Sequence, residues 1–216
     1  LLFIPAKGNA AGWAGFLLLG LAGLVDDARG MRSWLKLLIQ ILAGGFAVFG
    51  GGLLLEELGS WPSGAAITLG AAALPITWFA VVGFINSLNM LDGLDGLAGG
   101  VTAVMLFWLA YAAMLAGESL TAQTALVLAA AVIGFLVHNL RSPLRRRAAV
   151  FMGDSGSLAL GFAVAWLAIE VSQSPERVIS PTGLAWILVL PVMDTVSLMM
   201  RRIIRGQNPF HADRNH

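Results

Sequence analysis

Long apolar runs, separated by short polar stretches, make up most of the chain. Most of these runs are close to the ~20 residues that an α-helix needs to cross the ~30 Å hydrocarbon layer of a bilayer. The alternating apolar and polar pattern of a membrane barrel strand is absent. The pattern therefore predicts an all-α, polytopic integral membrane protein with about seven transmembrane helices. The predicted helices cover about residues 10–25, 35–55, 66–90, 97–117, 121–140, 156–172 and 182–200.

The basic residues predict how these helices are oriented. Eleven of the thirteen Lys and Arg lie after the first, fifth and seventh runs, which an alternating path places on one side of the membrane. Only Lys7 and Arg177 fall on the other side. Because basic residues concentrate in cytoplasmic loops, we predict that these three stretches are cytoplasmic. Six of the seven Asp lie in or beside predicted cytoplasmic loops, including the one after the third run, whereas all five Glu lie at the outer face, so the chemistry is predicted to be cytoplasmic.

Composition supports a membrane protein and excludes several kinds of site. The chain is 58% hydrophobic and 12% charged, with a mean hydropathy of +0.82. The net charge of +1 gives no indication of nucleic-acid binding, because the basic residues fall in short blocks beside apolar runs. The lack of cysteine excludes disulfides, thiolate metal sites and a cysteine nucleophile. We expect residues 1–216 to be a single transmembrane catalytic domain that continues beyond both ends.

The stretch from Asn86 to Gly96 is the first candidate site. Its oxygen-bearing side chains Asn86, Asn89, Asp92 and Asp95 follow one another at three-residue steps between two apolar runs. Polar groups are costly at such a position, and a hard cation bound with a phosphorylated substrate would explain them. The two glycines of the stretch are expected to end the helix and place both aspartates in a tight loop. The alternative is an asparagine pair that joins helices, followed by an ordinary Asp-Gly turn.

Two more candidates lie at the predicted cytoplasmic ends of other helices. Asp26 and Asp27 follow the first apolar run and could reach one polar cavity, although a solvated loop pair with Arg29 as partner is the simpler alternative. Asp154 stands between two glycines just before the sixth run. A helix N-terminus attracts phosphate, so an aspartate there fits better as a magnesium ligand than as a cap. A plain capping loop that uses the nearby serines is the alternative.

The C-terminal stretch holds His211, Asp213 and His216 after three arginines. The arginines are typical of a juxtamembrane basic loop. Membrane anchoring does not explain the two histidines and the aspartate, so this stretch is a further candidate for substrate contact.

These stretches occur in the order found in one family. The Asp26-Asp27 pair, N-x-x-N-x-x-D-G-x-D-G from Asn86, F-M-G-D-x-G-S from Phe151 and P-F-x-x-D-R-x-H from Pro209 resemble the motifs of the polyprenyl-phosphate N-acetylhexosamine-1-phosphate transferases. The tail is similar to the N-acetylglucosamine branch rather than the muramoyl-pentapeptide branch. The family has further transmembrane helices on either side, and its tail motif continues with more histidines, which this chain lacks.

The resemblance implies a multi-pass enzyme of the bacterial inner membrane with a cytoplasmic active site. Such an enzyme transfers a sugar-1-phosphate, here N-acetylglucosamine-1-phosphate, from a UDP-sugar to undecaprenyl phosphate and releases UMP, as the initiating step of cell-surface polysaccharide synthesis. The implied cofactor is Mg²⁺, with Mn²⁺ as the alternative, and the implied partners are the two substrates, membrane lipids and a second copy in a homodimer. UDP-N-acetylfucosamine-type and UDP-N-acetylmuramoyl-pentapeptide donors stay open. A multi-pass transporter is the alternative from another class of function, and a non-catalytic scaffold is a third.

The same resemblance implies roles for the catalytic and metal-binding residues. Asp154 and Asn89 look like the metal ligands. Asp26 is implied to orient or deprotonate the lipid phosphate, with Asp27 beside it. Lys36 matches a basic residue near this acidic pair.

The implied substrate contacts lie in the same loops. By resemblance, Phe151 stacks on uracil, Asn139 and Asp95 contact the uridine, and Asp92 supports the phosphate or ribose region. The two other residues implied to contact substrate are Asn86 and His216.

Overall fold

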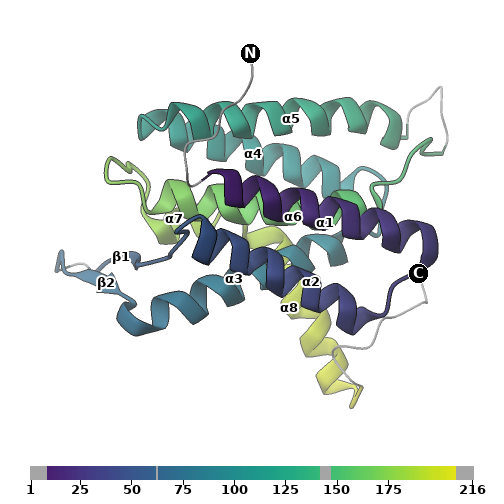
Figure 1. Cartoon of the computed structure of the whole chain (residues 1–216), viewed down its shortest axis with the longest axis horizontal. Helices are drawn as coiled ribbons and strands as arrows, with labels where there is room; N and C mark the ends of the chain where they lie inside the picture. The colour runs from purple at the N-terminus through teal and green to yellow at the C-terminus, as the bar shows by residue number, and fades with distance from the viewer. Residues whose placement is uncertain (1–8, 62, 142–146, 208–216) are drawn as a thin grey trace.

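The computed structural model describes residues 9–61, 63–141 and 147–207, and helices dominate this part of the chain (Figure 1). The long helices are α1 (Asn9–Arg29), α2 (Ser33–Gly45), α3 (Ala73–Leu91), α4 (Leu97–Leu115), α5 (Ser119–Asn139), α6 (Gly153–Ser172) and α8 (Val189–Ile204). The shorter elements are a π-helical turn (Phe46–Gly50), β1 (Glu57–Ser60), β2 (Ala66–Thr68), a 3₁₀ turn (Gly70–Ala72) and α7 (Pro181–Ala185).

Six helical stretches of the described residues are long and apolar enough to cross a membrane. This finding confirms the prediction of an all-α, polytopic membrane protein. The six stretches are Ala10–Arg29, Ser33–Gly50, Gly70–Leu91, Leu97–Leu115, Ser119–Asn139 and Gly153–Ser172.

Helix α6 is the buried centre of the bundle. It packs mainly against α1 and α3, and fourteen of its twenty residues are buried. A helix can be buried in this way because its residues are apolar on all sides. Glycines let the neighbouring helices approach closely: a Cβ on Gly15 would meet the Phe162 ring at 2.6 Å, and one on Gly161 would meet the Ile85 backbone at 2.9 Å. The polar N-terminus of α6 is therefore held at the middle of one end of the bundle.

The seventh apolar run forms two helices instead of the single long one predicted. Helix α7 begins after Ser180, whose hydroxyl accepts a hydrogen bond from the Gly183 N–H, and Pro181 occupies its first turn. The longer helix α8 starts at Val189, with Pro191 in its first turn. Proline lacks an N–H and is favoured at the start of a helix, so two prolines ten residues apart begin two helices. At 16 residues, α8 is shorter than the six membrane-length stretches.

The connection between α2 and α3 also differs from the prediction. The second helical stretch ends at Gly50 and the third begins at Gly70, so both are shorter than expected. Between them, β1 and β2 form an antiparallel hairpin, with Glu57 opposite Thr68 and Ser60 opposite Ala66. The Gln173 side chain fixes this connection to the end of α6, because its Oε1 accepts hydrogen bonds from the Glu56 and Glu57 N–H groups at 3.0 and 3.1 Å.

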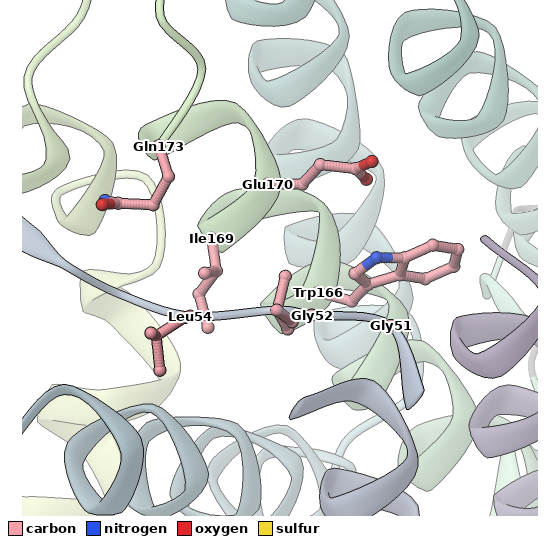
Figure 2. Close-up of a pocket in the computed structure, with 8 residues that line it drawn as sticks. Gly51, Gly52, Leu54, Trp166, Ile169, Glu170 and Gln173 are labelled. Atoms are coloured by element: carbon pink, nitrogen blue, oxygen red, sulfur yellow. The ribbon is translucent and has the colours of Figure 1, made fainter. Parts of the chain in front are cut away.

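The hairpin marks one end of the bundle, and the turn between α1 and α2 marks the other (Figure 1). A cavity of about 200 Å³ lies near the hairpin end, between Gly51–Leu54 and α6 residues that include Trp166, Glu170 and Gln173 (Figure 2). Glu170 follows Asp154 by sixteen residues, which is about 24 Å along a helix. The cavity is therefore separate from the polar residues at the start of α6.

Candidate functional site

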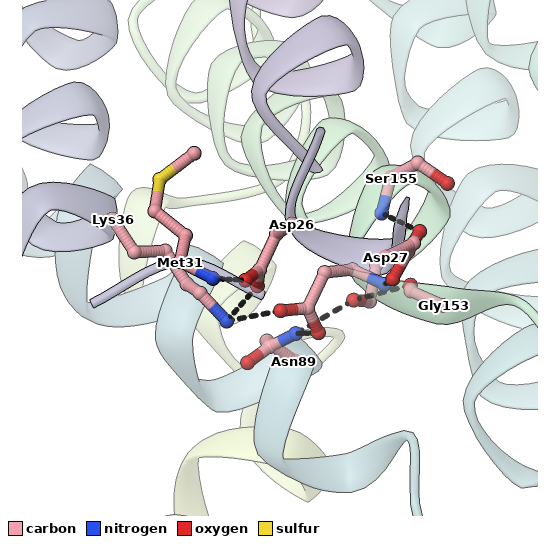
Figure 3. Close-up of polar contacts among 9 residues, drawn as sticks. Asp26, Asp27, Met31, Lys36, Asn89, Gly153 and Ser155 are labelled. Atoms are coloured by element: carbon pink, nitrogen blue, oxygen red, sulfur yellow. Dashed lines mark hydrogen bonds and ion pairs between the residues drawn. The ribbon is translucent and has the colours of Figure 1, made fainter. Parts of the chain in front are cut away.

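Side chains from α1, α2, α3 and α6 meet at the end of the bundle opposite the hairpin (Figure 3). The Lys36 ammonium forms ion pairs with both Asp26 and Asp154. The Asn89 Nδ2 donates a hydrogen bond to Asp154 Oδ1 at 2.8 Å. We call Asp26, Lys36, Asn89 and Asp154 the central cluster. Each member was predicted from a different stretch of sequence, and the structure brings all four together.

The turn between α1 and α2 positions two members of the central cluster, Asp26 and Lys36. Gly30 has a φ of +71°, a left-handed conformation that glycine adopts readily, and it reverses the chain between the two helices. Asp26 Oδ1 accepts a hydrogen bond from the Met31 N–H, so the same carboxylate that meets Lys36 also holds the turn. Lys36 lies in the first turns of α2 and consequently points back to the end of α1.

The start of α6 positions Asp154, another member of the central cluster. The two oxygens of Asp27 accept hydrogen bonds from the backbone N–H groups of Asp154 and Ser155, at 2.8 and 3.1 Å. The serines were predicted to cap this helix as the alternative to a metal site, but Ser157 donates to the Gly153 carbonyl at 2.9 Å and lies one turn into the helix. The Asp154 side chain does not cap α6 and faces Lys36 and Asn89 instead.

A second polar layer supports the cluster from the bundle side. Asn86, one turn before Asn89, donates to Gln40 Oε1 at 2.6 Å, and Gln40 lies one turn after Lys36. Gln40 is only 1% exposed. Ser157 adds a further contact, since its Oγ accepts a hydrogen bond from Asn89 Nδ2 at 2.8 Å. Sequence reasoning assigned no role to Gln40, although its spacing of four residues from Lys36 places both on one helix face.

The loop between α3 and α4 adds a carboxylate beside the cluster. Asp92 directly follows α3 and is half-buried. Burial, and to a smaller extent the negative charges of Asp154, Asp27 and Asp95, raise the pKa of Asp92 to about 6. The Asp92 carboxyl therefore binds a proton more readily than an ordinary aspartate does.

Two predicted uridine contacts are engaged with protein groups in this structure. Asp95 accepts a hydrogen bond from Arg141 Nε at 2.7 Å, in an exposed ion pair. Asn139 is 4% exposed; its Oδ1 accepts from the Gly96 N–H at 2.6 Å and its Nδ2 donates to the Val150 carbonyl at 2.7 Å. Asn139 thus joins the loop before α4 to the loop before α6. That either residue contacts uridine stays a prediction.

The remaining predicted contacts are one exposed residue and one that lies outside the described residues. Phe151 is 75% exposed, so its ring is free to stack on a planar ligand. His216 belongs to the stretch 208–216, which lies outside the described residues.

The oxygen donors of the central cluster fit a magnesium ion that is bound together with substrate phosphates. The Asp26 and Asp154 carboxylates already share one cationic group, the Lys36 ammonium. Asn89 Oδ1 has no hydrogen-bond partner among the described residues and is left to accept a cation. No group of three or more His, Asp or Glu that could hold a metal occurs in the described residues. This mixed donor set suits Mg²⁺, which commonly binds one or two carboxylates together with substrate phosphates.

Comparison with known proteins finds relatives that align with nearly the whole chain. The most similar relatives include undecaprenyl-phosphate alpha-N-acetylglucosaminyl 1-phosphate transferases. The protein of this name from Escherichia coli O157:H7 is 35% identical over 214 residues, which cover 99% of this chain and 58% of the relative. Those from Yersinia pestis and Haemophilus influenzae are 34% and 32% identical and are covered over 54% and 56% of their length. The chain thus spans little more than half the length of these relatives.

The family comparison covers most of the bundle. The sequence model described as glycosyl transferase family 4 matches residues 10–172, from the start of α1 to the end of α6. The match includes every member of the central cluster, together with Asp27, Asn86, Asp92, Asp95, Asn139 and Phe151. The chain belongs to glycosyl transferase family 4.

Proposed function

We propose that this chain forms the catalytic core of a membrane enzyme that transfers N-acetylglucosamine-1-phosphate from UDP-N-acetylglucosamine to undecaprenyl phosphate and releases UMP. The observation that carries this proposal is the central cluster, in which four helices bring two carboxylates, an ammonium and a carboxamide to one end of a bundle of membrane-length helices. The name shared by these relatives supports the choice of sugar and lipid. The reaction would initiate a cell-surface polysaccharide at the bacterial inner membrane, and the distribution of basic residues supports a cytoplasmic site.

The proposed step is a direct displacement at phosphorus. An oxygen of the lipid phosphate forms a bond to the β-phosphorus of the UDP-sugar, and the bond from this phosphorus to the bridging oxygen breaks. UMP leaves with that oxygen and its electron pair. A phosphate monoester is largely ionised at pH 7, because its second pKa is about 6, so the nucleophile needs no strong base. Asp26 is proposed to orient the lipid phosphate, and Lys36 to supply positive charge beside it.

Asp154 and Asn89 are proposed to hold the magnesium ion, with Asp26 close by. When bound, the ion would neutralise charge on the pyrophosphate as that charge develops in the transition state. The protein fixes the direction of the Asp154 carboxylate through Asn89 Nδ2 on one oxygen and Lys36 on the other. Ser157 in turn accepts the second hydrogen bond of Asn89, which limits rotation of the carboxamide.

The exposed loops beside the cluster are proposed to bind the nucleotide. Phe151 offers an uncovered ring at the start of α6, where it could stack on uracil. Asp95 lies in the neighbouring loop and is held by Arg141 at the protein surface. Asn139 joins these two loops through its buried carboxamide. It is therefore proposed to support the nucleotide site from beneath.

The test measures UMP release by the full-length protein with undecaprenyl phosphate, Mg²⁺ and a panel of UDP-sugars. UMP release with UDP-N-acetylglucosamine is expected, and Asp154→Asn should reduce it by on the order of 100-fold or more because a charged ligand is lost. Glu56→Gln, an exposed change near the hairpin, is the control and should keep full activity. Release only with another UDP-sugar would refute the choice of sugar. A well-folded Asp154→Asn protein with full turnover would remove Asp154 from the site.

A further inference from the structure

The neighbouring residues Asp26 and Asp27 face different parts of the molecule (Figure 3). Asp26 belongs to the central cluster through Lys36 and also accepts a hydrogen bond from the Met31 N–H. Asp27 is an exposed residue, but both of its carboxylate oxygens are directed at the backbone of α6, at Asp154 and Ser155. Among the described residues, Asp27 forms no ion pair with Lys36. The pair is therefore divided between a side-chain cluster and a helix terminus.

The start of α6 needs an acceptor from outside the helix. The first N–H groups of an α-helix have no partner within the helix, and the residue that usually caps them supplies a side-chain oxygen. Here the residue at that position is Met152, whose side chain makes no capping hydrogen bond in the described structure. Asp27, on α1, supplies both acceptor oxygens instead. Its negative charge is also stabilised by the positive end of the α6 helix dipole.

Two glycines shape the chain around this contact. Gly153 has a φ of +65°, and a Cβ at this position would lie 2.6 Å from Asp27 Oδ2. On α1, a Cβ on Gly23 would overlap the backbone of Ser155. Side chains at either position would separate Asp27 from the N–H groups that it binds. These separate observations indicate that the contact between α1 and the start of α6 is built for Asp27.

We propose that Asp27 is a positioning residue rather than a catalytic one. By capping α6 across the helix interface, Asp27 fixes the backbone of Asp154, and this backbone directs the Asp154 carboxylate at Lys36 and Asn89. Asp26 alone of the pair faces the reacting groups. The proposal deepens the proposed function and rests on it for the role of Asp154 in the reaction.

Hydrogen–deuterium exchange of the full-length protein tests the contact without using turnover. In Asp27→Ala, exchange in peptides that contain the amides of Asp154 and Ser155 should rise on the order of fivefold or more, the effect of losing a helix cap. Asp26→Ala is the matched neighbour and should raise exchange at Met31, leaving the start of α6 protected. Equal exchange at the start of α6 in wild type and Asp27→Ala would overturn the proposal.

UMP release by Asp27→Asn separates positioning from direct chemistry. This variant loses the charge but keeps one acceptor oxygen, so we expect turnover within about tenfold of wild type, well above that of Asp27→Ala. Its KM for the UDP-sugar should match wild type, because Asp27 contacts the backbone of α6 and not the substrate. Activity as low as that of Asp27→Ala, with the start of α6 still protected in both variants, would make Asp27 a direct participant and refute the proposal. Absence of UMP release in wild type would refute the proposed function instead, while the exchange experiment would still decide whether Asp27 holds α6.

Discussion

The close contact between α1 and α6 can be tested with two glycines of α1, Gly20 and Gly23. They lie three residues apart and both face α6. A Cβ on Gly20 would make an ordinary contact with Ala159 Cβ at 3.9 Å, whereas one on Gly23 would overlap the Ser155 backbone. Because that obstacle is backbone, no side-chain rotation relieves it. Gly20→Ala and Gly23→Ala are thus chemically identical changes with opposite expected effects.

The magnitudes follow from three contributions. Replacing glycine by alanine within a helix stabilises it by about 1 kcal/mol, and both variants share this gain. In Gly23→Ala, overpacking costs about 1–3 kcal/mol. Displacement of Asp27 from the α6 terminus costs about 0.5–2 kcal/mol more. Gly20→Ala should therefore be stabilised by about 1 kcal/mol, and Gly23→Ala destabilised by about 0.5–4 kcal/mol.

Thermal unfolding of the full-length variants in one detergent gives the order of stability, and UMP release gives the functional effect. We expect the melting temperature of Gly23→Ala to lie below that of wild type, and the melting temperature of Gly20→Ala to equal or exceed it. Turnover should fall only in Gly23→Ala, because only this change moves α1 away from Asp154. If Gly23→Ala were as stable and as active as Gly20→Ala, the reasoning from close helix packing would be wrong.

Three further predictions concern the groups around the central cluster. Gln40→Leu removes the acceptor of the Asn86 carboxamide and should lower the free energy of unfolding by about 1–3 kcal/mol, measured by denaturation. Asp92 has a folded-state pKa of about 6, above its ordinary value of 3.8, so the folded protein binds more protons and loses stability as the pH rises through this window. Asp92→Asn should therefore gain stability relative to wild type between pH 4 and about pH 7, and a difference independent of pH would contradict the assignment. Phe151→Ala should raise the KM for the UDP-sugar about tenfold through lost stacking, whereas Phe79→Ala, at a residue 80% exposed on the membrane-length helix α3, should not.

The helices, and the side of the membrane on which the candidate residues lie, could be predicted because both depend on local pattern. Apolar runs give the helices, and the loop charges predict that Asp26, Asn89 and Asp154 lie on one side of the membrane. That Lys36 belongs with them was implied by the resemblance to the family. The division of the seventh run into two helices was missed because apolar residues predominate on both sides of Pro191, so hydrophobicity alone shows no break. The β1–β2 hairpin was also missed, since its strands are too short to show an alternating pattern.

Which of the two aspartates, Asp26 or Asp27, contacts Lys36 could not be predicted from the sequence. Consecutive residues on a helix point about 100° apart, so Asp26 and Asp27 were bound to differ in direction. Which of them meets Lys36 depends on how α1 packs against α6, and this packing is set by contacts between residues more than one hundred positions apart. The hydrogen bonds of Asn139 within the protein could not be predicted for the same reason, because its partners Gly96 and Val150 come from two separate loops.

For the proposed function, the Asn139 bridge has a consequence for nucleotide exchange. One carboxamide binds both the Gly96 N–H, next to Asp95, and the Val150 carbonyl, next to Phe151, so a movement of one of these backbone segments affects the other. Gly96 or Val150 can move away from α5 only if its hydrogen bond to the Asn139 carboxamide breaks. Nucleotide entry and UMP departure would then be governed by a single gating movement, and substitutions in the two loops should be non-additive in their effect on the rate of product release.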